Sequence, residues 1–167
     1  MDILDNLSSL PEWDDEGFRK IDEEDGNEFT ENGAGFAECK ALYNQWREVM
    51  AGINGLFSYA SQSAMFSEEF LQGQKNDVLS DAYQVAVKVR SSAQLDLYVL
   101  KMENAAIIRK NAMGIYTQVG GMAAMDFIEE EHAAAVRSDI DKFKLLFIDW
   151  VNTFEKDEFE DDWGFFV

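Results

Sequence analysis

Proline is nearly absent from this sequence. Pro11 is the only proline among 167 residues, so no proline interrupts the long stretch that follows it. Proline breaks helices because it lacks a backbone donor and clashes with the preceding turn. Its absence, together with apolar residues at spacings of three and four, predicts an all-α protein. We expect an elongated antiparallel bundle of three long helices, with a fourth helix supplied by the N-terminal segment or by a second copy in a homodimer.

Cysteine and long apolar runs are also scarce. The single cysteine, Cys39, excludes a disulfide within one chain, and this favours a reducing, cytoplasmic environment. No run of about 20 strongly apolar residues occurs, because the closest candidate, 49–67, is uncharged but rich in serine. The first residues lack the basic and apolar regions of a secretory signal. We therefore expect no membrane insertion and no secretion.

Basic residues are few, since 33 acids face 14 lysines and arginines and the net charge is −19. The acids are concentrated at the ends, with 12 acids and two bases in 1–33 and six acids and one base in 155–167. Such charge repels phosphates, so we expect no direct binding to nucleic acid and attraction to a basic partner. The chain is interpreted as one domain with an acidic N-terminal segment (1–33), a helical bundle (34–154) and an acidic, aromatic C-terminal tail (155–167).

The spacing of apolar residues predicts helices at about 36–72, 77–118 and 122–154. The predicted turns lie at glycines, first near 73–76 and then at Gly120 and Gly121. The third helix has the clearest pattern, because six apolar residues follow spacings of 4, 3, 4, 3 and 4. They are Val136, Ile140, Phe143, Phe147, Trp150 and Phe154. This is the heptad seam of left-handed helix packing.

One set of candidate ligands combines the only cysteine with the only histidine. Glu129 and His132 have the Glu-x-x-His spacing of di-iron bundles, but one histidine cannot complete such a centre in one chain. If the helices turn near 75 and 120, Cys39 and its neighbour Glu38 lie level with that pair. The layer could bind zinc or activate a thiolate. Alternatively, Cys39 is an ordinary core residue and the glutamates are solvated.

Two further sets of side chains each allow two interpretations. The same register places Glu103 level with Arg47 and Arg137, which predicts either a buried acid with a shifted pKa or an ion pair between helices. Four methionines could line an adaptable groove or fill the core. They are Met102, Met113, Met122 and Met125.

The two acidic ends resemble each other, because both set aromatic residues among acids and glycine. The aromatic and terminal residues concerned are Trp13 and Phe18 at one end and Trp163, Phe165, Phe166 and Val167 at the other. Such segments suit docking into a basic, apolar groove on a partner protein. Alternatively, they fold back and cap the bundle.

These patterns favour a non-enzymatic interaction or regulatory protein that engages a protein partner through its acidic, aromatic ends. No catalytic residue set, phosphate-binding loop or cofactor motif is apparent, so no cofactor is expected. The alternative is a small metal-binding or thiol-dependent bundle that uses the layer of Cys39, His132 and Glu129. A third hypothesis, an acidic mimic of nucleic acid, requires acids spaced along a rigid surface, like phosphates on a duplex.

Overall fold

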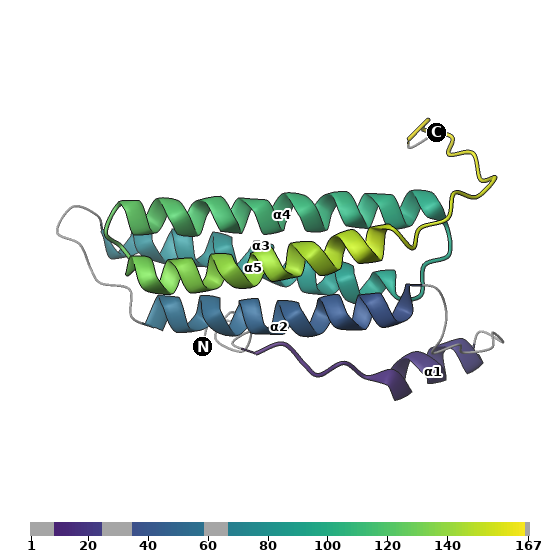
Figure 1. Ribbon diagram of the computed structural model, residues 1–167, viewed down its shortest axis with the longest axis horizontal. Coiled ribbons are helices and arrows are strands. Elements are labelled where there is room, and N and C mark those ends of the chain that lie inside the picture. Colours follow the sequence, from purple (N-terminus) through teal and green to yellow (C-terminus); the bar gives the residue numbers. More distant parts are fainter. Residues whose placement is uncertain (1–8, 25–34, 59–66, 166–167) are drawn as a thin grey trace.

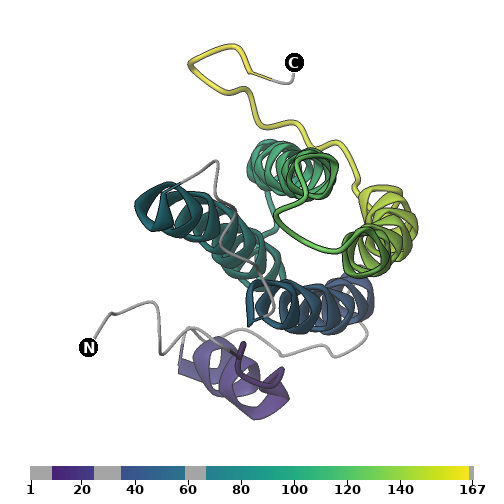
Figure 2. The same cartoon turned by 90° about the vertical axis from the view of Figure 1, so that its left-hand side faces the viewer.

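The chain folds into an all-helical bundle (Figure 1). The computed structural model describes residues 9–24, 35–58 and 67–165, and no strand occurs in these ranges. The helices are α1 (Asp15–Glu24), α2 (Phe36–Ser58), α3 (Glu68–Ser92), α4 (Tyr98–Ala124) and α5 (Glu130–Val151). Helices α2 to α5 run alternately up and down, and α5 returns beside α2 to close a ring of four (Figure 2). None of the described helices is long and apolar enough to cross a bilayer.

The predicted all-α bundle is confirmed, but the predicted division into three long helices is wrong. The fourth helix of the ring comes neither from the N-terminal segment nor from a second copy. It arises because the predicted helix 77–118 is interrupted after Ser92 and resumes at Tyr98 as α4. The N-terminal segment instead forms the short α1, which lies outside the ring (Figure 1).

The break between α3 and α4 uses neither glycine nor proline. The Ser92 hydroxyl donates to the Lys88 carbonyl at 2.7 Å and competes with the helical hydrogen bonds there. The same hydroxyl accepts from Asn104 of α4 at 3.0 Å, which holds the returning helix. The N–H of Tyr98 at the start of α4 is satisfied by Asp157, 59 residues further along the chain. A remote carboxylate therefore helps to define this helix start.

The predicted turns at glycines are also wrong. Residues 73–76 lie inside α3, and Gly120 and Gly121 lie inside α4. The turn before α5 instead occupies 125–129, where Asp126 adopts a left-handed φ of 57°. Part of the predicted helix 36–72, between Ser58 and Ser67, lies outside the described residues. Helix α3 then begins with Ser67 as N-cap, whose hydroxyl accepts the Phe70 N–H.

The core is organised around Trp46 of α2, which is fully buried. Its ring N–H donates to the Ala82 carbonyl of α3 at 2.7 Å, and its ring lies 4.7 Å from Phe143 of α5. Phe143 belongs to the predicted heptad seam of α5. Four of the six seam residues are buried, namely Val136, Ile140, Phe143 and Trp150, and the other two are partly buried. The seam prediction is therefore confirmed.

A polar seam joins α3 to α4. Asn104, Asn111 and Gln118 of α4 lie seven residues apart, and each donates a side-chain hydrogen bond to α3. The acceptors are Ser92, Gln84 and Gln74, respectively. Because a seven-residue repeat returns to the same helix face, these three bonds fix the register of the antiparallel pair.

Candidate functional site

The predicted layer of Glu38, Cys39, Glu129 and His132 does not form. Cys39 is 1% exposed near the start of α2 and lies beside Trp150, at the end of α5. His132 lies 18 residues before Trp150 on the same helix, about 27 Å away along its axis. Only Glu129 and His132 are brought together, at 3.5 Å on the exposed surface. No cluster of three His, Cys, Asp or Glu side chains suited to a metal occurs among the described residues.

The thiol of Cys39 is also poorly placed for nucleophilic chemistry. Burial raises its pKa to about 12, and hydrogen bonding from the Trp150 ring N–H only partly opposes this. A reactive cysteine requires the opposite, a lowered pKa and access to solvent. The interpretation of Cys39 as a core residue therefore describes it better than the thiol-dependent alternative.

The ion pair predicted for Glu103 is likewise not formed within the described part of the chain. Glu103 is exposed on α4. Arg47 instead approaches Glu12 at 3.9 Å, and Arg137 lies over the Tyr116 ring with its guanidinium carbon 4.5 Å from the centroid. The register was predicted from turns in the wrong places, so these partners differ.

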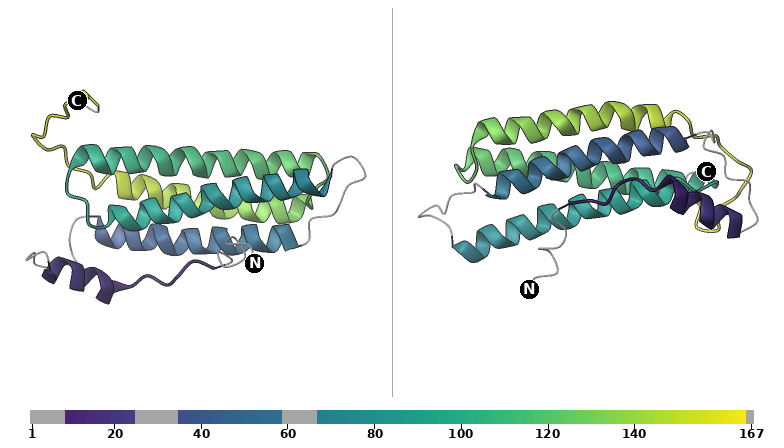
Figure 3. Two further views of the ribbon diagram at one scale, coloured as in Figure 1. Left: turned by 180° about the vertical axis from the view of Figure 1, so that it is seen from behind. Right: turned by 90° about the horizontal axis from the view of Figure 1, so that it is seen from below.

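The N-terminal aromatic residues are docked on the bundle. Phe18 is 5% exposed, and its ring lies 4.8 Å from Trp13 and 5.6 Å from Phe36 at the start of α2. The guanidinium of Arg90 from α3 covers the Phe18 ring at 5.7 Å. Figure 3 shows α1 alongside this end of the bundle. Phe18 is therefore not available to a partner in this conformation, while Trp13 is partly buried and packs against Phe18 and Tyr43.

Hydrogen bonds and ion pairs hold the same segment in place. The Lys40 ammonium lies 2.6 Å from Asp15 at the start of α1. The Tyr43 hydroxyl donates to the Pro11 carbonyl at 3.0 Å. The single proline thus lies in an extended stretch whose carbonyl is fixed to α2.

The C-terminal tail differs from the N-terminal segment, because its aromatics are exposed. Trp163 is 92% exposed, while Phe159 and Phe165 are 53% and 54% exposed. The predicted residues Phe166 and Val167 lie outside the described residues. Figure 1 shows that the tail leaves the end of α5 and passes the start of α4. Trp163 is therefore the most accessible large apolar side chain of the described tail.

Local hydrogen bonds shape the tail around Trp163. The Asp161 carbonyl accepts the Gly164 N–H at 2.8 Å, and the Asp161 carboxylate accepts the Phe165 N–H at 3.0 Å. Gly164 has a φ of 69°, which a residue with a side chain rarely adopts. This turn presents the indole outward. The tail is anchored upstream, because Asp157 accepts the Tyr98 N–H at 2.8 Å.

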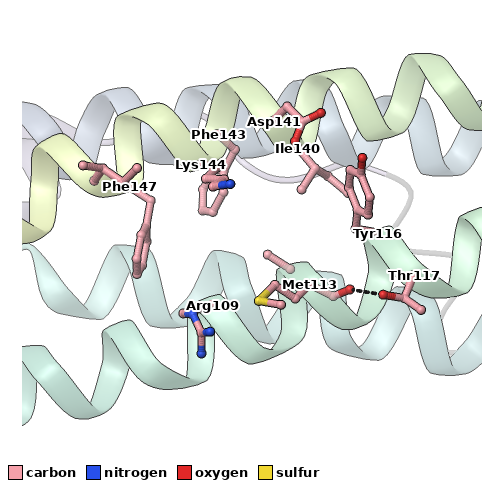
Figure 4. Close-up of a pocket in the computed structure, with 11 residues that line it drawn as sticks. Arg109, Met113, Tyr116, Thr117, Ile140, Asp141, Phe143, Lys144 and Phe147 are labelled. Atoms are coloured by element: carbon pink, nitrogen blue, oxygen red, sulfur yellow. Dashed lines mark hydrogen bonds between the residues drawn. The ribbon is translucent and has the colours of Figure 1, made fainter.

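A groove of about 420 Å³ runs between α4 and α5 (Figure 4). Ile140 and Phe143 of α5 form its buried floor. Met113 of α4 lies on one side, more than half exposed, and Phe147 of α5 lies on the other. The groove is therefore apolar and open to solvent. Of the four methionines considered for a groove, Met113 lines this one, whereas Met122 is buried in the core.

The charged side chains at the groove are mainly basic. Arg109 of α4 and Lys144 of α5 line it, and neither has an ion-pair partner among the described residues. Asp141 is the acid in the lining. Arg137 adds positive charge where it stacks on Tyr116. In a chain with a net charge of −19, this is a locally basic and apolar surface.

Apolar residues of α5 outside the heptad seam are a sequence signal for this groove that the seam alone does not include. Ile148 lines the groove and is 45% exposed, while Leu145 is 65% exposed on the same helix but does not line the groove; both lie outside the α5 seam. Two large apolar residues three positions apart on an exposed helix face indicate a second apolar surface.

The chain matches no family model, no curated protein and no solved structure. Its function is therefore argued from two features, the exposed tail around Trp163 and the groove between α4 and α5. Both are suited to recognition of another molecule.

Proposed function

We propose that this protein is a non-enzymatic helical-bundle interaction module that binds a protein partner through its C-terminal tail. The observation that supports the proposal is the exposed Trp163, presented by a turn that is closed by hydrogen bonds to Asp161. Exposed tryptophan is costly in water and is the residue type most enriched among binding hot spots. Phe18 does not share this role, since it is buried in the bundle, and Trp13 is partly buried against it.

The acids around the tryptophan favour a partner with a basic, apolar groove. The tail 155–167 carries six acids and one base. Such charge accelerates encounter with a positive surface, while the indole supplies most of the affinity after contact. We therefore expect the association rate to fall as salt is raised, with a smaller effect on the dissociation rate.

The test compares proteins captured from a lysate by the full chain and by the Trp163→Ala variant, identified by mass spectrometry. The matched control is Val87→Ala, which truncates an exposed apolar residue on α3, far from the tail in sequence. A partner retained by the unmodified chain and by the control, but lost with Trp163→Ala, supports the proposal. Partners that bind all three chains equally would refute it.

A second variant pair tests whether the turn itself matters. Gly164→Ala forces a side chain into a left-handed conformation, which costs about 1–2 kcal/mol. If the partner binds the preformed turn, affinity should fall about 5- to 30-fold. Gly121→Ala is the control, because that glycine is helical with nothing within 4 Å of an added Cβ. Equal affinities for the two variants would show that the turn is irrelevant.

A further inference from the structure

The α4–α5 groove has the properties that the tail requires of a partner. Its floor is apolar, and the cations Arg109 and Lys144 at its lining have no ion-pair partner among the described residues. The tail offers an exposed indole within a strongly acidic sequence. Apolar shape and opposite charge therefore match between two surfaces of the same chain.

The tail does not fill the groove of its own chain. Trp163 is 92% exposed, so it contacts very little of the bundle. The tail is long enough to reach the groove of its own chain. Arg109 lies 11 residues beyond the start of α4, about 16 Å along the helix, and the six residues from Asp157 to Trp163 can span about 20 Å. The groove thus remains open while the tail is anchored through Asp157 at the start of α4, within reach of it.

We propose that the groove binds the C-terminal tail of a second copy of this chain, and that two copies exchange tails reciprocally. Trp163 of each copy enters the groove of the other, where the acids of the tail face Arg109 and Lys144. A reciprocal exchange places the same two surfaces in contact twice and closes a two-fold dimer. This inference rests on the proposed function, because it names the partner of the same tail.

The surface available suits a weak, reversible dimer. A buried aromatic side chain removes roughly 150–250 Å² from water, so the exposed fractions of Phe159, Trp163 and Phe165 correspond to about 400 Å² per tail. Two tails therefore offer about 800 Å² of aromatic surface, and the groove surface that they cover brings the total to about 1,100 Å², the size of a weak, reversible interface. At about 0.15 M salt the Debye length is about 8 Å, which screens repulsion between the two acidic chains but leaves contacting charges attractive.

Sedimentation of the full chain over a range of concentrations is the first test. We expect a monomer–dimer equilibrium whose Kd rises at least about 30-fold with Trp163→Ala, as for removal of a hot-spot tryptophan. Reversal of the groove charges by Arg109→Glu with Lys144→Glu should have a similar effect. The control is Lys142→Glu, because Lys142 is exposed on α5 and pairs with Asp139 instead of lining the groove.

Circular dichroism confirms that each variant remains folded. If the double charge reversal unfolds the chain, Met113→Glu replaces it, since this change puts an acid into the groove at an exposed position. Dimerisation lost with Trp163→Ala and with the groove variant, but retained with Lys142→Glu, supports the exchange.

A mixing experiment isolates one tail–groove contact. The Trp163→Ala chain keeps its groove, and the charge-reversed chain keeps its tail, so neither should form homodimers. Mixed well above the Kd of the unmodified dimer, they should form a heterodimer, which is detected by labelling one chain at its N-terminal amine. Two variants that remain separate after mixing would overturn the proposal.

A chain that is monomeric at every concentration also overturns the inference. This holds both if the groove is empty and if the chain's own tail occupies it. A dimer that is insensitive to Trp163→Ala overturns it as well. Neither result removes the proposed function, which fails only if Trp163→Ala leaves capture of other proteins unchanged. The two failures are therefore distinguishable.

Discussion

Replacement of Phe18 by alanine should release the N-terminal segment and leave the four-helix ring folded. Burial of a phenylalanine contributes about 1.5–3 kcal/mol, and each of its ring contacts with Trp13 and Phe36 adds about 0.5–1.5 kcal/mol. The Arg90 guanidinium over the ring adds about 0.5–1 kcal/mol. Together these contributions allow about 3–7 kcal/mol, and we take the lower part of this range, about 3–5 kcal/mol, which is typical of Phe→Ala at buried sites. Because Phe18 lies outside the main core cluster, this loss should fall on the docking of α1.

Amide hydrogen exchange read by mass spectrometry measures this release directly. A loss of about 3 kcal/mol corresponds to exchange at least about 100-fold faster in residues 9–24, with protection of α2 to α5 retained. Ile21→Ala is the control, since Ile21 lies on the same helix and is 48% exposed. If Phe18→Ala accelerates exchange equally throughout the bundle, the segment is part of the cooperative core and the argument for local docking is refuted.

Three other substitutions test separate parts of the structure. The pKa of the Cys39 thiol is about 12 in the folded chain and about 8.5 in the unfolded chain. Between these two pH values the unfolded thiol has lost its proton and the folded thiol has not. The free energy of unfolding should therefore fall by up to about 1.4 kcal/mol for each pH unit in this range. Cys39→Ala should remove the contribution of the thiol to this pH dependence, as measured by denaturant titrations at several pH values. The contribution of Tyr43 should remain, because burial also raises the pKa of Tyr43. Asn111→Ala should cost about 1–2 kcal/mol in the same titrations, because a buried hydrogen bond to α3 is lost. Asp157→Ala should cost about 1 kcal/mol and accelerate hydrogen exchange in the first turn of α4.

Sequence periodicity was sufficient to predict the bundle and the α5 seam. The seam depends only on spacing along one helix, and Val136, Ile140, Phe143 and Trp150 are buried as that spacing requires. Prediction of this kind succeeds because burial of one helix face dominates the energetics of helix packing.

The positions of the helix ends could not be predicted in the same way. The break after Ser92 depends on Asn104 and on Asp157, which are remote in the sequence. Conversely, Gly73 and Gly121 stay helical, because a glycine inside a helix costs only about 1 kcal/mol and tertiary packing exceeds that. Turn prediction from glycine alone therefore failed at both places.

Misplaced turns also explain why the predicted metal layer was wrong. With two turns the last helix would run parallel to α2, whereas the additional turn after Ser92 makes α5 antiparallel to α2 and so reverses the order in which α5 residues lie along it. The prediction set Cys39 level with Glu129, whereas the fold places it beside Trp150. Only the local pair of Glu129, the N-cap of α5, and His132, three residues further in the first turn, lies close together as predicted.

The contrast between the two acidic ends shows why composition alone could not separate a docked segment from an available one. The cations that meet the N-terminal segment, Lys40 and Arg47, project from α2 beside it and are occupied by its acids. Within the described part of the chain, Trp163 is not covered by a cation, and Arg109 and Lys144, which have no ion pair there, lie further along α4 and α5. The distribution of basic side chains over the folded surface therefore decides which acidic, aromatic segment remains free to bind. This distribution exists only after the register of the four helices is fixed.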